Sequence, residues 1–134
     1  MAQVQRITFL KTSLKDQPGT LSGIMQNLKS KNIGLKGLWG YGKEDGTAEL
    51  FIIPKDVAAV KSLWTAAGLT VEEGTVFFLT GSDKTGVLLK KLAVLTTANV
   101  NIKAMNALAV EGKYGSVIWV DAADVDKAAK ALEV

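Results

Sequence analysis

Two short loops of the same kind contain the side chains best suited to binding a ligand. The first reads Asp-Gln-Pro-Gly-Thr-Leu over residues 16–21, and the second reads Asp-Lys-Thr-Gly-Val-Leu over residues 83–88. In both, a strand-like apolar segment ends at the aspartate, and a segment with helical spacing follows the glycine. The free N–H groups of a helix start attract a carboxylate, while an aspartate accepts hydrogen bonds from an ammonium group. The chemistry indicated is the binding of a small zwitterion.

The same loops also have a purely structural interpretation. Asp16 and Asp83 could each cap a helix by accepting a hydrogen bond from the backbone N–H three residues on, a contact worth about 1 kcal/mol. Gly19 and Gly86 lack a β-carbon, which would let a ligand approach the backbone closely. Pro18 gives up an N–H that the first helical turn does not use. Taken alone, either loop favours the capping interpretation over a binding site.

The composition argues against catalysis. The chain has 134 residues, a net charge of +3, no cysteine and no histidine, so the commonest general base, metal ligand and thiolate nucleophile are all missing. A small phosphate-ester or acyl-phosphate hydrolase would need an anion-holding arginine, and Arg6 lies in a predicted strand rather than in a loop. We therefore expect no catalytic residues, no metal site, no cofactor and no enzymatic activity.

The two loops belong to an internal repeat with a constant offset. The same offset separates Asp16 from Asp83 and Gly19 from Gly86, and it also relates Asn32 to Asn99. Without a gap it places residues 50–53 on residues 117–120, and one inserted residue then aligns residues 56–57 with residues 124–125. We interpret this as a tandem duplication. The expected join lies near residues 72–74, which gives domains 1–74 and 75–134.

Each copy has the periodicity of a strand–helix–strand–strand–helix–strand unit, the ferredoxin-like βαββαβ plan of an α+β protein. Asn32 and Asn99 are expected to end their helices in a left-handed conformation. The second copy stops too early for its last strand, so one sheet edge is expected to be bare or covered by another chain or copy. The predicted strands are residues 4–12, 35–41, 47–53, one that begins at residues 69–71, and then 76–79, 102–110 and 116–120. The helices lie within residues 21–28, 57–67, 88–98 and 125–132.

With these motifs in that order, the sequence resembles the ACT domain, a small-molecule-binding regulatory module. The loops at residues 16–21 and 83–88 match the ACT loop, although the second lacks the proline, and Lys-Asn-Ile-Gly-Leu at residues 31–35 matches the entry into the second strand. Residues 99–105 match that entry in the other copy. The resemblance implies two ACT-like repeats whose antiparallel sheets pack side by side with helices on one face. It also implies a non-catalytic regulatory protein with a free amino acid bound at the seam.

The resemblance also suggests which residues bind. ACT domains with serine-like ligands are similar to this sequence at Asn101, whose amide would reach across to a ligand held by the first loop, whereas the aligned residue of the first copy is Gly34. Alternatively, Asn101 only starts a strand and is solvated. The expected site comprises Asp16, Gln17, Pro18, Gly19, Thr20, Leu21, Asn101, Ile102 and Lys103, and a weaker second site comprises Asp83, Lys84, Thr85, Gly86, Val87, Leu88, Gly34 and Leu35.

An RNA-binding domain of the same βαββαβ topology is the alternative. Tyr114 and Trp119 stand near the positions of its third-strand stacking aromatics, but Ser116 replaces the central one and the net charge is small for a phosphate-binding surface. We expect no nucleic-acid partner and no membrane partner, since no run of residues approaches the length of a membrane helix. A cytoplasmic location and homo-oligomerisation through a sheet edge or a helix face complete the expectations.

Overall fold

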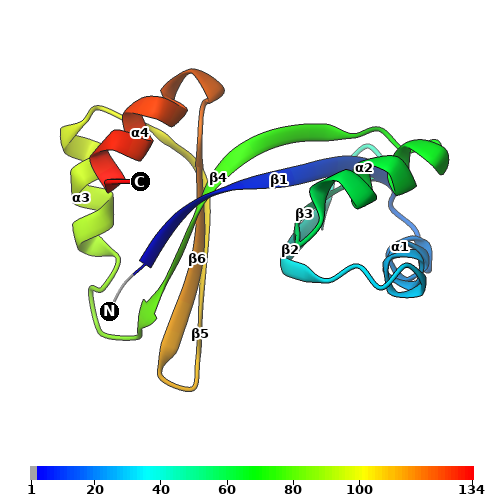
Figure 1. Cartoon of the computed structure of the whole chain (residues 1–134), viewed down its shortest axis with the longest axis horizontal. Coiled ribbons are helices and arrows are strands. Elements are labelled where there is room, and N and C mark those ends of the chain that lie inside the picture. Colours follow the sequence, from blue (N-terminus) through cyan, green and yellow to red (C-terminus); the bar gives the residue numbers. More distant parts are fainter. Residues whose placement is uncertain (1–2) are drawn as a thin grey trace. The chain divides into compact units, whose positions relative to one another are not determined.

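The computed structural model describes residues 3–134, which form two compact units of helices and strands (Figure 1). The first unit is Thr8–Gly74, and the second contains Thr75–Val134 together with the described N-terminal residues up to Ile7. In chain order the elements are β1 (Gln3–Lys15), α1 (Thr20–Ser30), β2 (Leu35–Gly42), β3 (Thr47–Pro54), α2 (Val57–Ala66), β4 (Glu72–Ser82), α3 (Leu89–Thr97), β5 (Ile102–Val110), β6 (Lys113–Val120), a short 3-10 turn (Ala122–Asp124) and α4 (Val125–Leu132).

The core of the first unit lies between one face of its sheet and its two helices. Side chains alternate along a strand, so Leu10 and Leu14 of β1 share a face with Leu50 and Ile52 of β3 through the antiparallel pairing of these strands. The apolar stripes of the two helices cover that face and close a single cluster. The helical members of the cluster are Ile24, Leu28, Val60 and Trp64.

The second unit repeats this arrangement. Phe77 and Leu79 of β4 lie on the helix-covered face together with Ile118 of β6, and Leu95 of α3 and Leu132 of α4 pack on them.

Asn32 and Asn99 end α1 and α3 with φ angles of 55° and 59°, the left-handed conformation expected from the sequence. Among the described residues, no helix is long and apolar enough to cross a membrane.

The strands β1 and β4 each contribute to both units. The hydrogen-bonded strand order is β2-β3-β1-β4-β6-β5, and residues 3–7 of β1 belong to the second unit, where Val4 packs on the core and Arg6 pairs with Asp126 at 2.8 Å. As expected from the sequence, the second copy has no strand of its own after α4, and the start of β1, which comes from the first copy, takes that place. Residues 3–7 group with Thr75–Val134, and the expected domains 1–74 and 75–134 stay a prediction.

The alignment of the two copies also needs a correction in the third strand. Leu10 pairs with Ile52 in the first unit, and Phe77, its counterpart at the repeat offset, pairs with Ile118. The same offset would relate Ile52 to Trp119 instead, so the second copy is shorter than the first by a single position between these strands. The gapless match of residues 50–53 to residues 117–120 is therefore wrong by one position.

Both loops are held in the same way. The Asp16 N–H donates to the Gly46 carbonyl at 3.0 Å, and the Asp83 N–H donates to the Gly112 carbonyl at 2.9 Å. The two acceptor glycines have φ angles of 82° and 77°, a left-handed conformation that glycine adopts without steric cost. The hairpin turn of each unit thus fixes the residue at which its loop begins.

A candidate amino-acid site in the first unit

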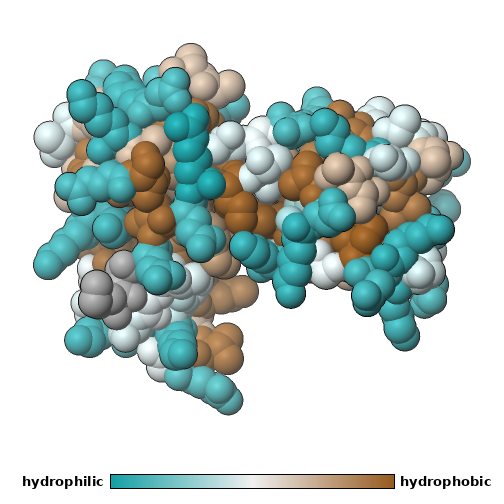
Figure 2. All heavy atoms as spheres, viewed as in Figure 1, coloured by the Kyte–Doolittle hydropathy of each residue, from teal (hydrophilic) through white to brown (hydrophobic). Residues whose placement is uncertain are grey.

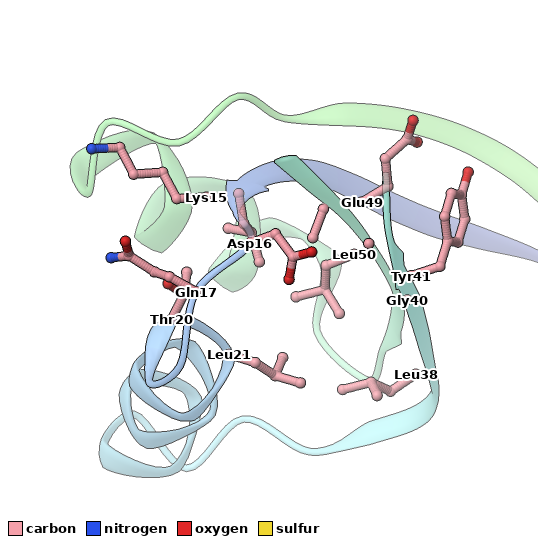
Figure 3. A pocket seen from close by; sticks show the side chains of 13 residues that line it. Lys15, Asp16, Gln17, Thr20, Leu21, Leu38, Gly40, Tyr41, Glu49 and Leu50 are labelled. Atoms are coloured by element: carbon pink, nitrogen blue, oxygen red, sulfur yellow. The ribbon is translucent and has the colours of Figure 1, made fainter. Parts of the chain in front are cut away.

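A cavity of about 330 Å³ lies in the first unit, between the loop that follows β1 and the neighbouring strands β2 and β3 (Figure 3). The start of α1 forms one wall, and the hairpin of β2 and β3 forms the opposite wall. The size is at the lower end of the range of ligand pockets, about 300–1,000 Å³. The lining residues are Leu14, Lys15, Asp16, Gln17, Thr20, Leu21, Leu38, Gly40, Tyr41, Gly42, Ala48, Glu49 and Leu50.

Apolar side chains form much of the cavity lining, and one carboxylate points into it. Figure 3 shows the Asp16 carboxylate pointing toward the strands, with Leu21 of α1 and Leu38 of β2 facing one another below it. Lys15 and Glu49 point away from this space. Leu21 and Leu38 are 46% and 41% exposed, and apolar surface is visible beside α1 in Figure 2. The cavity therefore offers an open apolar surface next to one negative charge.

Asp16 does not cap α1. The N-cap residue is Gly19, with a φ angle of 93°, and no side chain bonds to the first turn. Within residues 3–134, the Asp16 carboxylate forms no hydrogen bond or ion pair, and the N–H groups of Leu21 and Ser22 donate to no acceptor. The capping interpretation is likewise wrong for Asp83, because α3 begins after Leu88 without a side-chain cap. The first loop leaves both a carboxylate and two helix-start donors unpaired.

Gly42 makes room for the carboxylate. A β-carbon built on Gly42 would overlap Asp16 Oδ2 and would lie 3.2 Å from the Asp16 carboxyl carbon. Gly19 has a different role from the one expected, because a β-carbon there would meet nothing within 4 Å and the positive φ angle explains the glycine. The close approach in this site is therefore made by strand β2, not by the loop.

An ion-pair network engages the other acidic residue that lines the cavity. The Lys11 ammonium lies 2.7 Å from Glu49 Oε2, and Lys43 lies 3.4 Å from Glu49 Oε1. The hydrogen bond from Lys11 lowers the pKa of Glu49, and the same bond raises the pKa of Lys11. Glu49 is thus ionised and already paired, which leaves Asp16 as the carboxylate in the cavity that is free for a cationic group.

Comparison with solved structures identifies the fold. A protein from Bacteroides thetaiotaomicron superimposes with a TM-score of 0.85 at 22% identity, over 97% of this chain and 88% of that one. The ligand-free regulatory subunit of aspartate kinase from Thermus thermophilus gives a TM-score of 0.66 at 14% identity, over 98% and 94% of the two chains. This is the ACT-type fold. Aspartokinase III of E. coli, solved in complex with lysine and aspartate, matches with a TM-score of 0.55 at 15% identity, over 98% of this chain and 32% of that one.

The ACT-type fold is assigned from structure, because no protein-family model and no curated protein matches the sequence. The sheet with antiparallel pairings and four helices agrees with the α+β class predicted from the sequence. Among residues 3–134, no group of three or more acidic side chains is arranged to hold a metal ion.

The residues expected at the seam lie in different units of the ACT-type fold. Asn101 is exposed just before β5, Ile102 is half-buried, and Lys103 pairs with Asp121 at 3.3 Å. These residues belong to the second unit, whereas residues 16–21 belong to the first. The same division separates residues 83–88 from Gly34 and Leu35. The pairing of each loop with the opposite strand entry therefore stays a prediction.

Sequence reasoning missed the strand side of the cavity. Leu38, Gly42 and Leu50 line it together with the loop, although they belong to strands that follow α1 in the chain. The glycine-rich run at residues 37–42 was a usable signal, since it predicts close packing. The neighbour that it packs against at Gly42 is Asp16 itself.

Of the two aromatic residues that suggested RNA binding, Trp119 is half-buried, whereas Tyr114 lies in the core of the second unit. Tyr114 is 5% exposed and Phe77 is fully buried, and both belong to the core under the helices. Base stacking requires aromatic rings on the exposed face of the sheet. Neither Tyr114 nor Phe77 is placed for that contact.

Proposed function

We propose that this protein is a non-catalytic regulator that binds a free amino acid in the cavity of its first unit. The observation that supports this most directly is that the unpaired Asp16 carboxylate and Leu21, whose N–H at the helix start is free, belong to the lining of one cavity. The loop, the helix start and an apolar wall supply one partner for each part of an amino acid.

Each part of the ligand has a group of matching chemistry. The ligand carboxylate accepts hydrogen bonds from the N–H groups of Leu21 and Ser22, and the helix dipole favours a negative charge there. The ligand ammonium donates to the Asp16 carboxylate, a charge-assisted hydrogen bond. The ligand side chain lies against Leu21, Leu38 and Leu50, and the volume of about 330 Å³ favours a small ligand.

Regulation follows if the ligand binds one arrangement of the protein more tightly than another. The regulatory subunits of aspartate kinase and the lysine- and aspartate-bound aspartokinase III share this fold, which supports an amino-acid effector here. In this proposal Asn101 of the second copy completes the site from across the seam. Homo-oligomerisation and a cytoplasmic location remain part of the same proposal.

A thermal-shift screen tests the proposal. The purified chain is heated with each of the twenty amino acids, and nucleotides and a single-stranded RNA serve as controls. A ligand at a hundred times its dissociation constant adds about 2.7 kcal/mol to the stability of the folded state. A rise in Tm with one or a few amino acids supports the proposal, and a shift with RNA alone rejects it.

A mutant pair then locates the site. Asp16→Ala removes the partner of the ammonium, and Asp83→Ala is the matched control because it makes the same change at the same loop position of the other copy. We expect titration calorimetry to show loss of amino-acid binding in the first variant and unchanged binding in the second. The opposite pattern would move the site to the second unit.

A further inference from the structure

We propose that the protein binds one ligand per chain, because Tyr114 fills the space in the second unit that corresponds to the cavity of the first. The number of bound ligands rests on the proposed function. The filling by Tyr114 does not, since it concerns the packing of the protein itself.

Strand pairing establishes the equivalence of Ala48 and Tyr114. Ala48 of β3 lies between Leu14 of β1 and Gly42 of β2. In the second unit, the residue of β6 that lies between the corresponding positions of β4 and β5 is Tyr114, which pairs with Gly81 and Ala109. The two third-strand residues therefore have the same place in their sheets, although the sequence repeat does not align them.

The two positions differ in the size of the side chain and in what surrounds it. Ala48 lines the open cavity, whereas Tyr114 is 5% exposed and belongs to the buried core cluster. Val87 and Leu88 pack on that cluster. These two residues correspond to Thr20 and Leu21, which in the first unit line the cavity. The loop residues that line an open cavity in the first unit thus pack, in the second unit, on the cluster that contains Tyr114.

The neighbours of Tyr114 compensate for its size. Where the first unit has Leu14 beside a small alanine, the second unit has Gly81 beside a large tyrosine. The position of Gly42, which leaves room for the Asp16 carboxylate, is taken by Ala109. Protein cores are closely packed, so this exchange of large and small residues closes the second cavity while it retains the fold.

The hydroxyl of Tyr114 has no role in holding the ring. Its oxygen is buried and has no hydrogen-bond partner within the part of the chain that the structure describes. An unpaired hydroxyl in a core is unfavourable, so the ring is retained for the volume that it fills. The proposal therefore makes residues 83–88 a structural loop and replaces the expected weaker second site with a closed one.

Removal of the ring should create a cavity that accepts a ring-shaped probe. We expect Tyr114→Ala to lower the Tm and phenol at millimolar concentration to restore part of the loss. The same phenol concentration should leave the Tm of the wild type unchanged. Leu108→Ala is the matched control, because Leu108 lies on the neighbouring strand β5 and is 76% exposed. A folded Tyr114→Ala protein whose Tm does not respond to phenol would overturn the proposal.

If Tyr114→Ala does not fold, Tyr114→Leu leaves a smaller hollow, and xenon replaces phenol as the probe. A xenon-129 chemical shift in the presence of Tyr114→Leu that differs from the shift in the presence of the wild type supports the proposal that Tyr114 fills a cavity. The same shift for both proteins contradicts it. Calorimetry with any amino acid found in the screen should give one ligand per chain. Two ligands per wild-type chain would reject this inference and leave the proposed function standing. Absence of amino-acid binding with an intact phenol response would reject only the proposed function.

Discussion

Asp16 and Gly42 lie in contact across the cavity wall, so close that a β-carbon on Gly42 would overlap the Asp16 carboxylate. Asp16 directly follows β1 and Gly42 ends β2, and the whole of α1 lies between them in the sequence. This contact makes Gly42 a positioning residue for the carboxylate that the ligand ammonium is expected to meet.

Gly42→Ala should therefore weaken amino-acid binding. The added methyl group displaces the Asp16 carboxylate, and the loss of one charge-assisted hydrogen bond corresponds to roughly 1–3 kcal/mol. Titration calorimetry measures the change. Gly115→Ala is the control, because a β-carbon at Gly115 meets nothing within 4 Å and its φ angle is not left-handed. Equal affinity of the two variants would contradict the assigned role of Gly42.

The asparagine of the second copy gives a separate prediction. If the Asn101 amide reaches the ligand across the seam, Asn101→Ala lowers the affinity by roughly 1–3 kcal/mol. Asn106→Ala is unsuitable as a control, because the Asn106 amide oxygen accepts from Val117 N–H, so Asn27→Ala in α1 serves instead. Unchanged binding in Asn101→Ala would favour the solvated interpretation of this residue.

The Lys11–Glu49 pair predicts a specific pH dependence of stability. The pKa of Glu49 is lowered in the folded state, so its contribution is present above the ordinary value of 4.5 and is lost as the pH falls through the folded value. The pKa of Lys11 is raised above 10.5, so its contribution is present at neutral pH and is lost as the pH rises through the folded value.

Glu49→Gln should accordingly reduce the free energy of unfolding by about 1 kcal/mol near pH 7. Urea denaturation at several pH values should show the difference from the wild type shrinking below pH 4.5 and above pH 10.5. A difference that stays constant from acid to alkali would mean that packing, not charge, is responsible.

The unpaired hydroxyl of Tyr114 predicts a stabilising substitution. Tyr114→Phe keeps the ring and removes a buried polar atom without a partner in the described residues, so the stability should rise by about 1 kcal/mol. Tyr41→Phe is the matched control, since Tyr41 is 52% exposed and should change little. A loss of stability in Tyr114→Phe would show that the hydroxyl has a partner in solution.

The start of β1 should be essential to the second unit. Val4→Asp places a charge against the core of that unit and should cost roughly 1–3 kcal/mol. Hydrogen exchange should accelerate in α3 and α4 and change less in α1 and α2. Gln5→Asp, at the neighbouring exposed position, is the control. Equal effects on both pairs of helices would contradict the division of β1 between the units.

The sequence predicted the element order well because local signals determine it. Alternating apolar residues, helical stripes and the turn residues at Asn32 and Asn99 all act over a few positions. The last strand of the second copy was not predictable in this way, since residues 3–7 come from the opposite end of the chain. Only the loop side of the cavity was predicted, because the loop is a local sequence motif. Leu38 and Leu50 reach the cavity through strand pairing, which a local motif does not reveal.

The division of β1 between the units also has a consequence for synthesis. Residues 3–7 leave the ribosome before any other part of the second unit, yet their partners follow only after all of Thr8–Gly74 has been made. The first unit can assemble during translation, while the beginning of its own strand has no hydrogen-bonded neighbour until β4 has been made. Such distant closure is slow to form, and the ion pair between Arg6 and Asp126 can form only after α4 has been made.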